Sequence, residues 1–352
     1  MPQTQEAAKG LDIPEVKRAD PLQHWSWSLS ISRMPDYKLS VSDVYREFTL
    51  RCLHDDPDLF ILSTVEDSAQ SRIQDLPSWV PDFSVPLTRS LLAHPDLDVK
   101  IPYNASGETE RSLTWSESTP TVITLRGHSI GLIQGVLDVE PHPSVPVLIG
   151  EVIDFTKNLP TIYSTRETKS EALWRTLTAN IGNAPEYEYP APGAYSEFFL
   201  SYVRKEDAGS ETFSKNEDSQ GAGGLPHSIA RVPSGNKDEE SSDTDFEDET
   251  ANHDGDGDRH RPQDLEVAIG RVMKERRFFV TDNELYGIGP QSIRNGDLVV
   301  IFAGGLVPYI VRPKNNGSTA IFSLIGECYC HGSCQELAPG ASDRNWENVQ
   351  LG

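Results

Sequence analysis

The densest group of side chains with chemical potential lies near the C-terminus, where Cys328, Cys330, His331 and Cys334 stand close together. Three thiols and an imidazole form a ligand set that Zn²⁺ accepts. Structural zinc sites usually draw their ligands from separated knuckles, whereas these residues are nearly contiguous. On a strand, Cys328 and Cys330 would also point to the same face. We therefore predict small buried residues and no metal here, and we expect no disulfide in a reducing compartment.

A second group is the acidic repeat from Asp254 to Asp258, which resembles the start of a calcium-binding EF-hand loop. That loop needs glycine at its sixth position for a sharp turn and glutamate at its twelfth as a bidentate ligand. The chain has Arg259 and Leu265 at these positions. The repeat is therefore predicted to be a solvated acidic run.

The sequence lacks the other common catalytic signatures. The run Gly287-Ile288-Gly289 is without the third glycine of a dinucleotide-binding loop, because Ser292 occupies that place. There is no Gly-x-Ser-x-Gly elbow, phosphate-binding Walker loop or His-Glu-x-x-His motif. The 9 histidines are scattered along the chain. We therefore predict no catalytic, cofactor-binding or metal-binding residues and no cofactor, with a site assembled from distant residues as the open alternative.

The chain has 352 residues and a formal net charge of -23, and this charge is unevenly distributed. Between Lys205 and Pro262 there are 16 acidic and 6 basic residues and few large apolar ones. Such a segment cannot bury enough surface to offset its ordering entropy, so 205–262 is predicted to be disordered. An acidic chain without a basic stripe is repelled by phosphate backbones, which argues against nucleic acid as a partner.

Apolar runs in the sequence are short. None approaches the roughly 20 apolar residues that a transmembrane helix needs, and the N-terminal residues lack the apolar core of a signal peptide. We therefore expect a soluble cytoplasmic protein that does not associate with membranes.

Amphipathic helices are predicted where apolar residues recur at helical spacing. Ser40 with Asp43, and Thr168 with Glu171, have the spacing of a capping box, in which each side chain satisfies a backbone N–H at the start of a helix. Gly182 is placed to end the second helix. The predicted helices cover residues 41–54, 169–181, 194–204 and 264–276.

Strands are predicted where short runs of β-branched and aromatic residues are bounded by turn residues. The pattern gives a buried strand at 59–63 and two strands at 121–127 and 130–136, with a turn or bulge between them at Gly127-His128. Residues 277–332 predict an antiparallel meander, in which Gly304-Gly305 forms a hairpin turn.

The segment 76–83 contains Pro77 and Pro81 on either side of a Trp-Val pair. The prolines are expected to hold the backbone extended. A tryptophan in such a segment can anchor a loop in the core or face a ligand, and we favour the core for Trp79.

The predicted fold is α+β, with several amphipathic helices packed on mostly antiparallel strands. The expected divisions are a poorly ordered leader at 1–35, the first part of a single domain at 36–204, the acidic insertion at 205–262, the closing helix and meander at 263–334, and a flexible tail at 335–352.

Several short motifs follow one another in a recognisable order. The most specific reads Leu-Pro-Ser-Trp-Val-Pro-Asp-Phe at 76–83, and the others lie at 37–48, 276–281, 287–290, 296–300, 307–313 and 326–332. Together they resemble the region that follows the HET domain in fungal heterokaryon-incompatibility proteins. The resemblance covers about 36–332 apart from the acidic insertion. It singles out the positions Trp79, Pro81, Asp82, Gly296, Asp297, Pro308, Gly326 and Glu327.

The chain departs from the family pattern in two places. Phe83 stands where the family has a second tryptophan, and the Asp-Pro-Arg-Asp-Lys motif that usually precedes the 37–48 helix is absent. Only 35 residues precede the match, so the HET domain itself is expected to be missing.

The resemblance implies a part in fungal non-self recognition. We expect a non-catalytic recognition or regulatory module of a HET-like protein that acts through protein partners. The alternatives are a small intracellular enzyme with a spatially assembled site and a truncated, non-functional gene product. A deep pocket with converging histidine and carboxylate groups would favour the enzyme, and a core filled by Trp79 would favour the module.

Overall fold

A computed structural model of the chain describes residues 38–56, 58–66, 73, 75–92, 103–116, 118–138, 143–183, 187–214, 260–314, 320–334 and 344–352. The helices in these ranges are α2 (Val41–Asp55), α3 (Phe60–Ser63), α4 (Val145–Phe155), α5 (Lys169–Leu177), α6 (Ala194–Ser214) and α7 (Pro262–Met273). The strands are β1 (Leu113–Ser116), β2 (Thr119–Val136), β3 (Arg276–Thr281), β4 (Tyr286–Pro290), β5 (Leu298–Phe302), β6 (Tyr309–Lys314), β7 (Ile321–Glu327), β8 (Tyr329–Cys330) and β9 (Glu347–Leu351).

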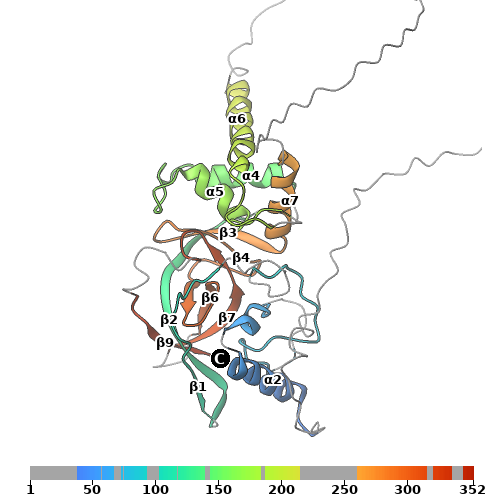
Figure 1. Cartoon of the computed structure of the whole chain (residues 1–352), viewed down its shortest axis with the longest axis vertical. Coiled ribbons are helices and arrows are strands. Elements are labelled where there is room, and N and C mark those ends of the chain that lie inside the picture. The colour runs from blue at the N-terminus through green and yellow to red at the C-terminus, as the bar shows by residue number, and fades with distance from the viewer. Residues whose placement is uncertain are drawn as a thin grey trace, which may run out of the picture.

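Five strands close into a ring at the centre of the fold (Figure 1). β2 pairs with β5, β5 with β6, β6 with β7, β7 with β9, and β9 returns to β2. The β7–β9 pair is parallel, and the other pairs of the ring are antiparallel. A sheet closed in this way is a β-barrel, in which every strand of the ring has a neighbour on both sides.

β2 belongs both to the barrel and to the sheet beyond it. Its residues 123–127 pair with β9, residues 127–132 with β5, and residues 133–136 with β3. Its register shifts twice, between Ser129 and Gly131 and again before Gly135. Shifts of this kind are β-bulges, which bend a strand and increase its twist. The bends let one strand serve three successive partners.

Gly127 lies where β2 passes from β9 to β5. A Cβ atom at this position would lie 2.8 Å from Val300 and 2.9 Å from Val349, which is closer than side chains approach. Both neighbours are β-branched and therefore stiff, so only glycine fits without a rearrangement.

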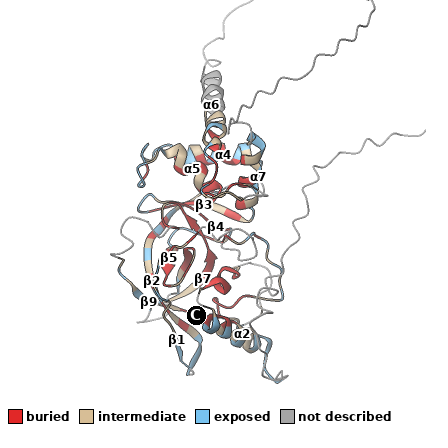
Figure 2. Ribbon diagram, viewed as in Figure 1, coloured by how far each residue is buried: buried red, intermediate tan, exposed pale blue. Residues whose placement is uncertain are grey.

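Beyond the barrel, β3, β4 and β8 extend the sheet from the last residues of β2. The helices α4, α5, α6 and α7 pack against one another and cover β3 and β4, on the side away from α2 (Figure 1). Buried residues lie in the strands, on the inward faces of these helices, in α3 and in residues 77–81 (Figure 2). A second, smaller apolar cluster joins β5–β7 to the extension and contains Ile133, Phe279, Ile310, Cys328 and Cys330.

The predicted α+β class with mostly antiparallel strands is confirmed. The first helix matches its prediction, and the hydroxyl of Ser40 accepts a hydrogen bond from the N–H of Asp43, 3.1 Å away. The helix predicted at 169–181 begins with the expected Thr168 cap but ends at Leu177. Ala179 and Asn180, which have positive φ angles of 51° and 56°, turn the chain before Gly182 is reached.

The other helix predictions differ at their ends. α6 continues to Ser214, past the predicted end at 204. α7 begins at Pro262, because proline suits the first turn of a helix, and the carboxylate of Asp264 accepts the N–H of Arg261 at 2.7 Å. α7 ends at Met273, and residue 276 already belongs to β3. No helix was predicted for α4, whose run of apolar residues has no capping signal beyond Pro146.

The strand predicted at 59–63 is wrong, because residues 60–63 form the short helix α3. All four of its residues are buried, so the sequence shows no alternation that would separate a strand from a helix. The carboxylate of Asp58 accepts the N–H of Phe60 at 2.9 Å and fixes the start of the turn.

The two strands predicted at 121–127 and 130–136 are one continuous strand, β2. The bulge expected at Gly127-His128 lies two residues later, at the register shift between Ser129 and Gly131. The sequence shows the glycines but not the several partners that β2 has to reach. The hairpin at Gly304-Gly305 is confirmed, since the N–H of Gly305 donates to the carbonyl of Phe302 at 2.8 Å.

The flexible tail predicted at 335–352 is wrong for its last residues. Residues 347–351 form β9, which lies between β2 and β7 and closes the barrel. The predicted leader at 1–35 and most of the acidic insertion lie outside the described residues. None of the described helices is long and apolar enough to cross a lipid bilayer.

Leu351 tests the role of β9. Its side chain is fully buried in the core. Replacing Leu351 by alanine should lower the free energy of unfolding by about 2–5 kcal/mol, because the change removes buried methyl groups and leaves a cavity. Urea denaturation followed by circular dichroism measures this loss.

The matched control is Glu347→Ala, at an exposed position of the same strand. It should change the free energy of unfolding by no more than about 0.5 kcal/mol. Equal, small effects of the two substitutions would mean that β9 is not part of the barrel in solution.

Candidate functional site

Trp79 packs inside the fold. Its side chain is fully buried, and its indole N–H donates to the carbonyl of Thr121 on β2 at 2.9 Å. The hydroxyl of Ser78 bridges β7 and the C-terminus, because it accepts the N–H of Leu324 at 2.9 Å and donates to the carbonyl of Gly352 at 2.7 Å. The preference for a core tryptophan is confirmed.

The backbone around Trp79 is a turn and not the extended segment that was predicted. The N–H of Val80 donates to the carbonyl of Pro77 at 3.0 Å. Proline restricts itself and the residue before it, so Pro77 and Pro81 leave Ser78 and Trp79 free to turn. Pro81 is buried behind this turn.

The end of the same motif binds the turn to α2. Phe83 stacks edge-on against Tyr45 and Phe48, with ring centroids 5.1 and 5.2 Å apart. Asp82 holds the local loop, because its carboxylate accepts the N–H groups of Ile73 and Ser84 at 3.3 and 3.0 Å. The motif thus joins α2 to the barrel, because Phe83 packs against α2 and Trp79 is hydrogen-bonded to β2.

Gly296 and Asp297 form the turn that leads into β5. Gly296 has a positive φ of 92°, a conformation that glycine adopts easily. Asp297 is almost fully buried and binds the guanidinium of Arg312 through both carboxylate oxygens, at 2.7 and 2.8 Å. This bidentate pair ties the turn to β6.

Gly326 and Glu327 end β7 beside a second buried ion pair. Oε1 of Glu327 lies 3.0 Å from Nη2 of Arg276, and both side chains are fully buried. The same oxygen accepts the N–H of Leu92 at 2.8 Å. Nη1 of Arg276 donates to the carbonyl of Val272 at the end of α7, at 2.9 Å. One carboxylate therefore connects β7, β3, α7 and the loop at 89–92.

Both partners of this pair keep an unsatisfied buried atom among the described residues, Nε of Arg276 and Oε2 of Glu327. Burial lowers the pKa of Arg276 to about 10, although the charge of Glu327 acts in the opposite direction. Gly326 is required beside the pair, since a Cβ there would lie 2.8 Å from the guanidinium of Arg89. Pro308 is also buried, and its carbonyl accepts the N–H of Cys328 at 2.9 Å.

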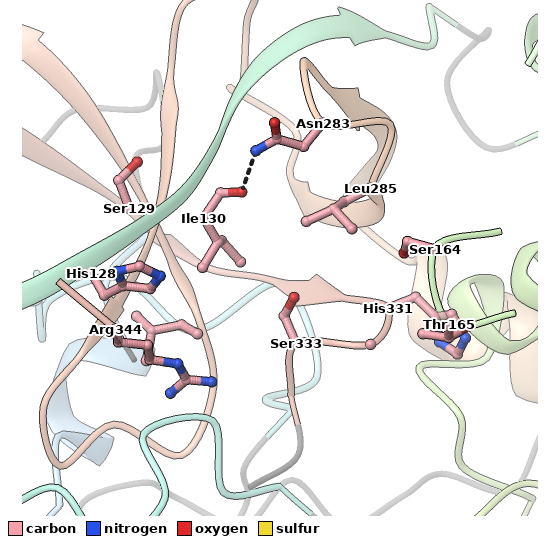
Figure 3. A pocket seen from close by; sticks show the side chains of 12 residues that line it. His128, Ser129, Ile130, Ser164, Thr165, Asn283, Leu285, His331, Ser333 and Arg344 are labelled. Atoms are coloured by element: carbon pink, nitrogen blue, oxygen red, sulfur yellow. Dashed lines mark hydrogen bonds between the residues drawn. The ribbon is translucent and has the colours of Figure 1, made fainter. Parts of the chain in front are cut away.

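A pocket of about 350 Å³ lies elsewhere, where β2, the turn after β8 and the start of β9 meet (Figure 3). His128 and Arg344 lie on one side of it in this view, and His331 and Thr165 lie on the other. Its lining is otherwise made of hydroxyl, amide and aliphatic groups. None of the motif positions from Trp79 to Glu327 is part of the lining.

In the predicted Cys-His group, His331 has side-chain partners at both of its ring nitrogens. Its Nε2 lies 2.6 Å from Oε1 of Glu167, and its Nδ1 lies 2.9 Å from the hydroxyl of Tyr329. Both ring nitrogens are thus engaged, and the imidazole is held in place between β8 and the loop before α5.

The three cysteines beside His331 are free thiols and are buried. Cys328 and Cys330 lie in the same apolar cluster, as expected for one face of a strand. Burial raises the pKa of Cys330 to about 12, so its sulfur stays protonated. Within the described ranges, no group of three or more histidine, cysteine or carboxylate side chains is arranged to hold a metal ion.

Two comparisons identify the relatives of this fold. A family model described as the Het-6 beta-barrel domain matches residues 149–345. The chain belongs to this family. It is also 24% identical over 292 residues to heterokaryon incompatibility protein 6, OR allele, of Neurospora crassa. That alignment covers 75% of this chain and 38% of the Neurospora protein, so the chain spans well under half the length of its relative. No solved structure matches the chain.

The family's description names a β-barrel, and three of the five strands of the ring, β5, β6 and β7, lie within the matched residues, whereas β2 and β9 lie outside them. The predicted resemblance to heterokaryon-incompatibility proteins is confirmed. The motif positions that carry the resemblance lie in the core, in turns and in buried ion pairs. In this Het-6 barrel they build the fold, and the pocket is lined by other residues.

Sequence reasoning missed Glu167 and Arg344 and interpreted His128 as a turn residue. Glu167 and His331 are 164 residues apart in the sequence, so spacing could not reveal the pair. Arg344 fell in the supposed tail. The alternation of Val349 and Leu351 with polar neighbours was the available sign that this tail is a strand.

Glu327→Gln tests the buried ion pair. The substitution leaves the guanidinium of Arg276 without a counter-charge in a site that has no exposed surface. The free energy of unfolding should fall by about 3–5 kcal/mol. Denaturant unfolding at neutral pH measures the change.

The control is Asp138→Asn, since Asp138 pairs with Arg277 at 2.9 Å but its side chain is 95% exposed. Loss of an exposed pair should cost no more than about 1 kcal/mol. If the two variants were equally stable, the Arg276–Glu327 pair would not hold the layers together.

Glu167 predicts a dependence of stability on pH. Burial raises the pKa of Glu167, but hydrogen bonds from His331 and Thr165 and the charge of Arg175 outweigh burial, and the net pKa is lowered. A lowered folded-state pKa contributes stability above the unfolded pKa, and this contribution is lost as pH falls through the folded value.

The Glu167→Gln variant should therefore lose less stability than the wild type when the pH falls below about 4.3, the ordinary pKa of glutamate. Urea unfolding at a series of pH values compares the slopes. Glu151→Gln, at an exposed position of α4, should keep the wild-type slope. Parallel curves for the wild type and Glu167→Gln would contradict this account of the pair.

Proposed function

We propose that the chain is a non-catalytic recognition or regulatory module in fungal heterokaryon incompatibility, and that it acts by binding a protein partner. The proposal rests on family membership together with the similarity to the Neurospora incompatibility protein. The main observation behind the proposal is that the residues of the family motifs, above all Trp79 and Glu327, are buried and hold the fold together.

The geometry of the pocket supports binding over catalysis. A general base needs a nitrogen that is free to take a proton, and both nitrogens of His331 already have partners. Nδ1 of His128 lies 3.0 Å from the carbonyl of Asn345, so Nε2 of His128 is the one histidine nitrogen of the described lining that could take a proton, and no described hydroxyl is hydrogen-bonded to it. No carboxylate side chain contributes to the described lining. The cysteines that could act as nucleophiles are buried thiols outside the pocket.

The role is tested by co-purification from cells of paired incompatible fungal strains. The tagged chain should enrich a specific protein from one strain, and the purified partner should rebind the purified chain in calorimetry. Leu351→Ala should weaken this binding, since a destabilised barrel presents its surface less often. A folded, monodisperse chain that enriches nothing beyond a tag control would overturn the proposal.

Two further variants separate this role from an enzyme. Ser164→Ala and Ser333→Ala each remove one of the four hydroxyl groups of the described lining that could act as a nucleophile. A recognition module should keep its partner binding and its effect on heterokaryon growth in both variants. Loss of the growth effect with binding intact would favour the enzyme.

A further inference from the structure

Arg344 places a cation at the edge of the pocket. Its Nη1 donates to the carbonyl of Ala105, and within the described ranges no carboxylate forms an ion pair with it. Burial lowers the pKa of Arg344. A partly buried guanidinium normally meets a carboxylate or another anion, because desolvation of an uncompensated charge is costly.

The lining of the pocket differs from the whole chain in its charge. The chain has 54 acidic residues against 31 lysines and arginines, yet no aspartate or glutamate lines the described pocket. The lining instead offers Arg344, two histidines, four hydroxyl groups and the amide of Asn283. Hydroxyl, amide and guanidinium donors are the groups that bind oxyanions.

The two histidines have different parts in this lining. Nε2 of His331 is already paired with Glu167, so this nitrogen is not available to a ligand. Nδ1 of His128 faces the carbonyl of Asn345, and because a carbonyl only accepts, this nitrogen carries a proton. Nε2 of the ring is then an acceptor, so the donors to an anion come from Arg344 and the hydroxyl groups of the lining. His128 and Arg344 lie on the same side of the pocket (Figure 3).

We propose that this pocket binds a small ligand that carries an oxyanion, a carboxylate or a phosphate, with Arg344 as its principal partner. A volume of about 350 Å³ suits a small molecule rather than a folded partner. The guanidinium would bind two oxygens of the anion, and the hydroxyl groups of Ser129 and Ser333 would supply further donors from the wall. The site goes beyond the proposed role and is independent of it, because binding is measured on the isolated chain.

The test is a titration of the isotope-labelled chain with inorganic phosphate and, separately, with acetate, followed by amide NMR at constant ionic strength. At least one of the two anions should bind saturably and shift resonances of the lining, including Ile130 and Gly332. Arg344→Gln should weaken that binding about tenfold or more, since it removes a charge-assisted contact. The anion that binds decides between a phosphate and a carboxylate ligand.

Two further substitutions keep the test decisive if Arg344→Gln unfolds the chain. Ser129→Asp adds a carboxylate to an exposed position of the lining and should weaken anion binding about tenfold, through repulsion. Asparagine has nearly the same shape as aspartate but no charge, so the Ser129→Asn variant should bind the anion as tightly as the wild type does. Arg204→Gln, on α6 outside the pocket, controls for the general loss of a positive charge.

Failure of both anions to bind saturably would overturn the proposal. Equal affinities of Ser129→Asp and Ser129→Asn would also overturn it, because an anion held in this pocket must respond to a carboxylate in its wall. A partner protein that still bound to the chain in either case would leave the proposed recognition role untouched.

Discussion

The approach of β5 and β9 to β2 at Gly127 is the constraint on which the rest of the fold depends. Two stiff valine side chains lie at the distance where a Cβ would clash, so the barrel closes only because that Cβ is missing. The bulges that follow allow β2 to leave the ring and pair with β3. One strand thereby joins the barrel to the layer that carries the helices α4–α7.

The buried ion pairs connect the same layers in a second way. Glu327 and Arg276 link the end of β7 to β3 and α7, and Asp297 with Arg312 links the turn before β5 to β6. A buried pair is not by itself a source of stability, because desolvation offsets much of the attraction. Removal of one partner is costly, however, because it leaves the other charge buried and unpaired. The motif residues of the family therefore stabilise the fold. This explains why they can be recognised in the sequence although they do not indicate a chemical function.

Local signals made part of this fold predictable. The caps at Ser40 and Thr168 placed two helices, and the β-branched runs placed β3 to β7, because in each case the deciding contact is near in sequence. The failures share the opposite property. The segment at 60–63 is buried on all sides and so has no alternating pattern. The sequence of β9 is mostly polar, and it forms a strand through its pairing with β2 and β7. The pocket could not be foreseen for the same reason, since His128 on β2 meets His331 and Arg344 only in the folded chain.

The position of the pocket couples it to barrel closure. Arg344 lies three residues before the start of β9, and His128 lies on β2, the strand that β9 joins. His128 also faces the carbonyl of Asn345, and its ring lies 6.3 Å from that of Trp346, so the wall of the pocket and the start of β9 are one structure. An interaction that holds this wall of the pocket in place therefore also holds the start of β9 in place. A ligand that bound only the closed barrel would stabilise it in proportion to its concentration, by mass action. β9 completes the barrel, so a ligand bound in the pocket would affect the rest of the molecule through β9.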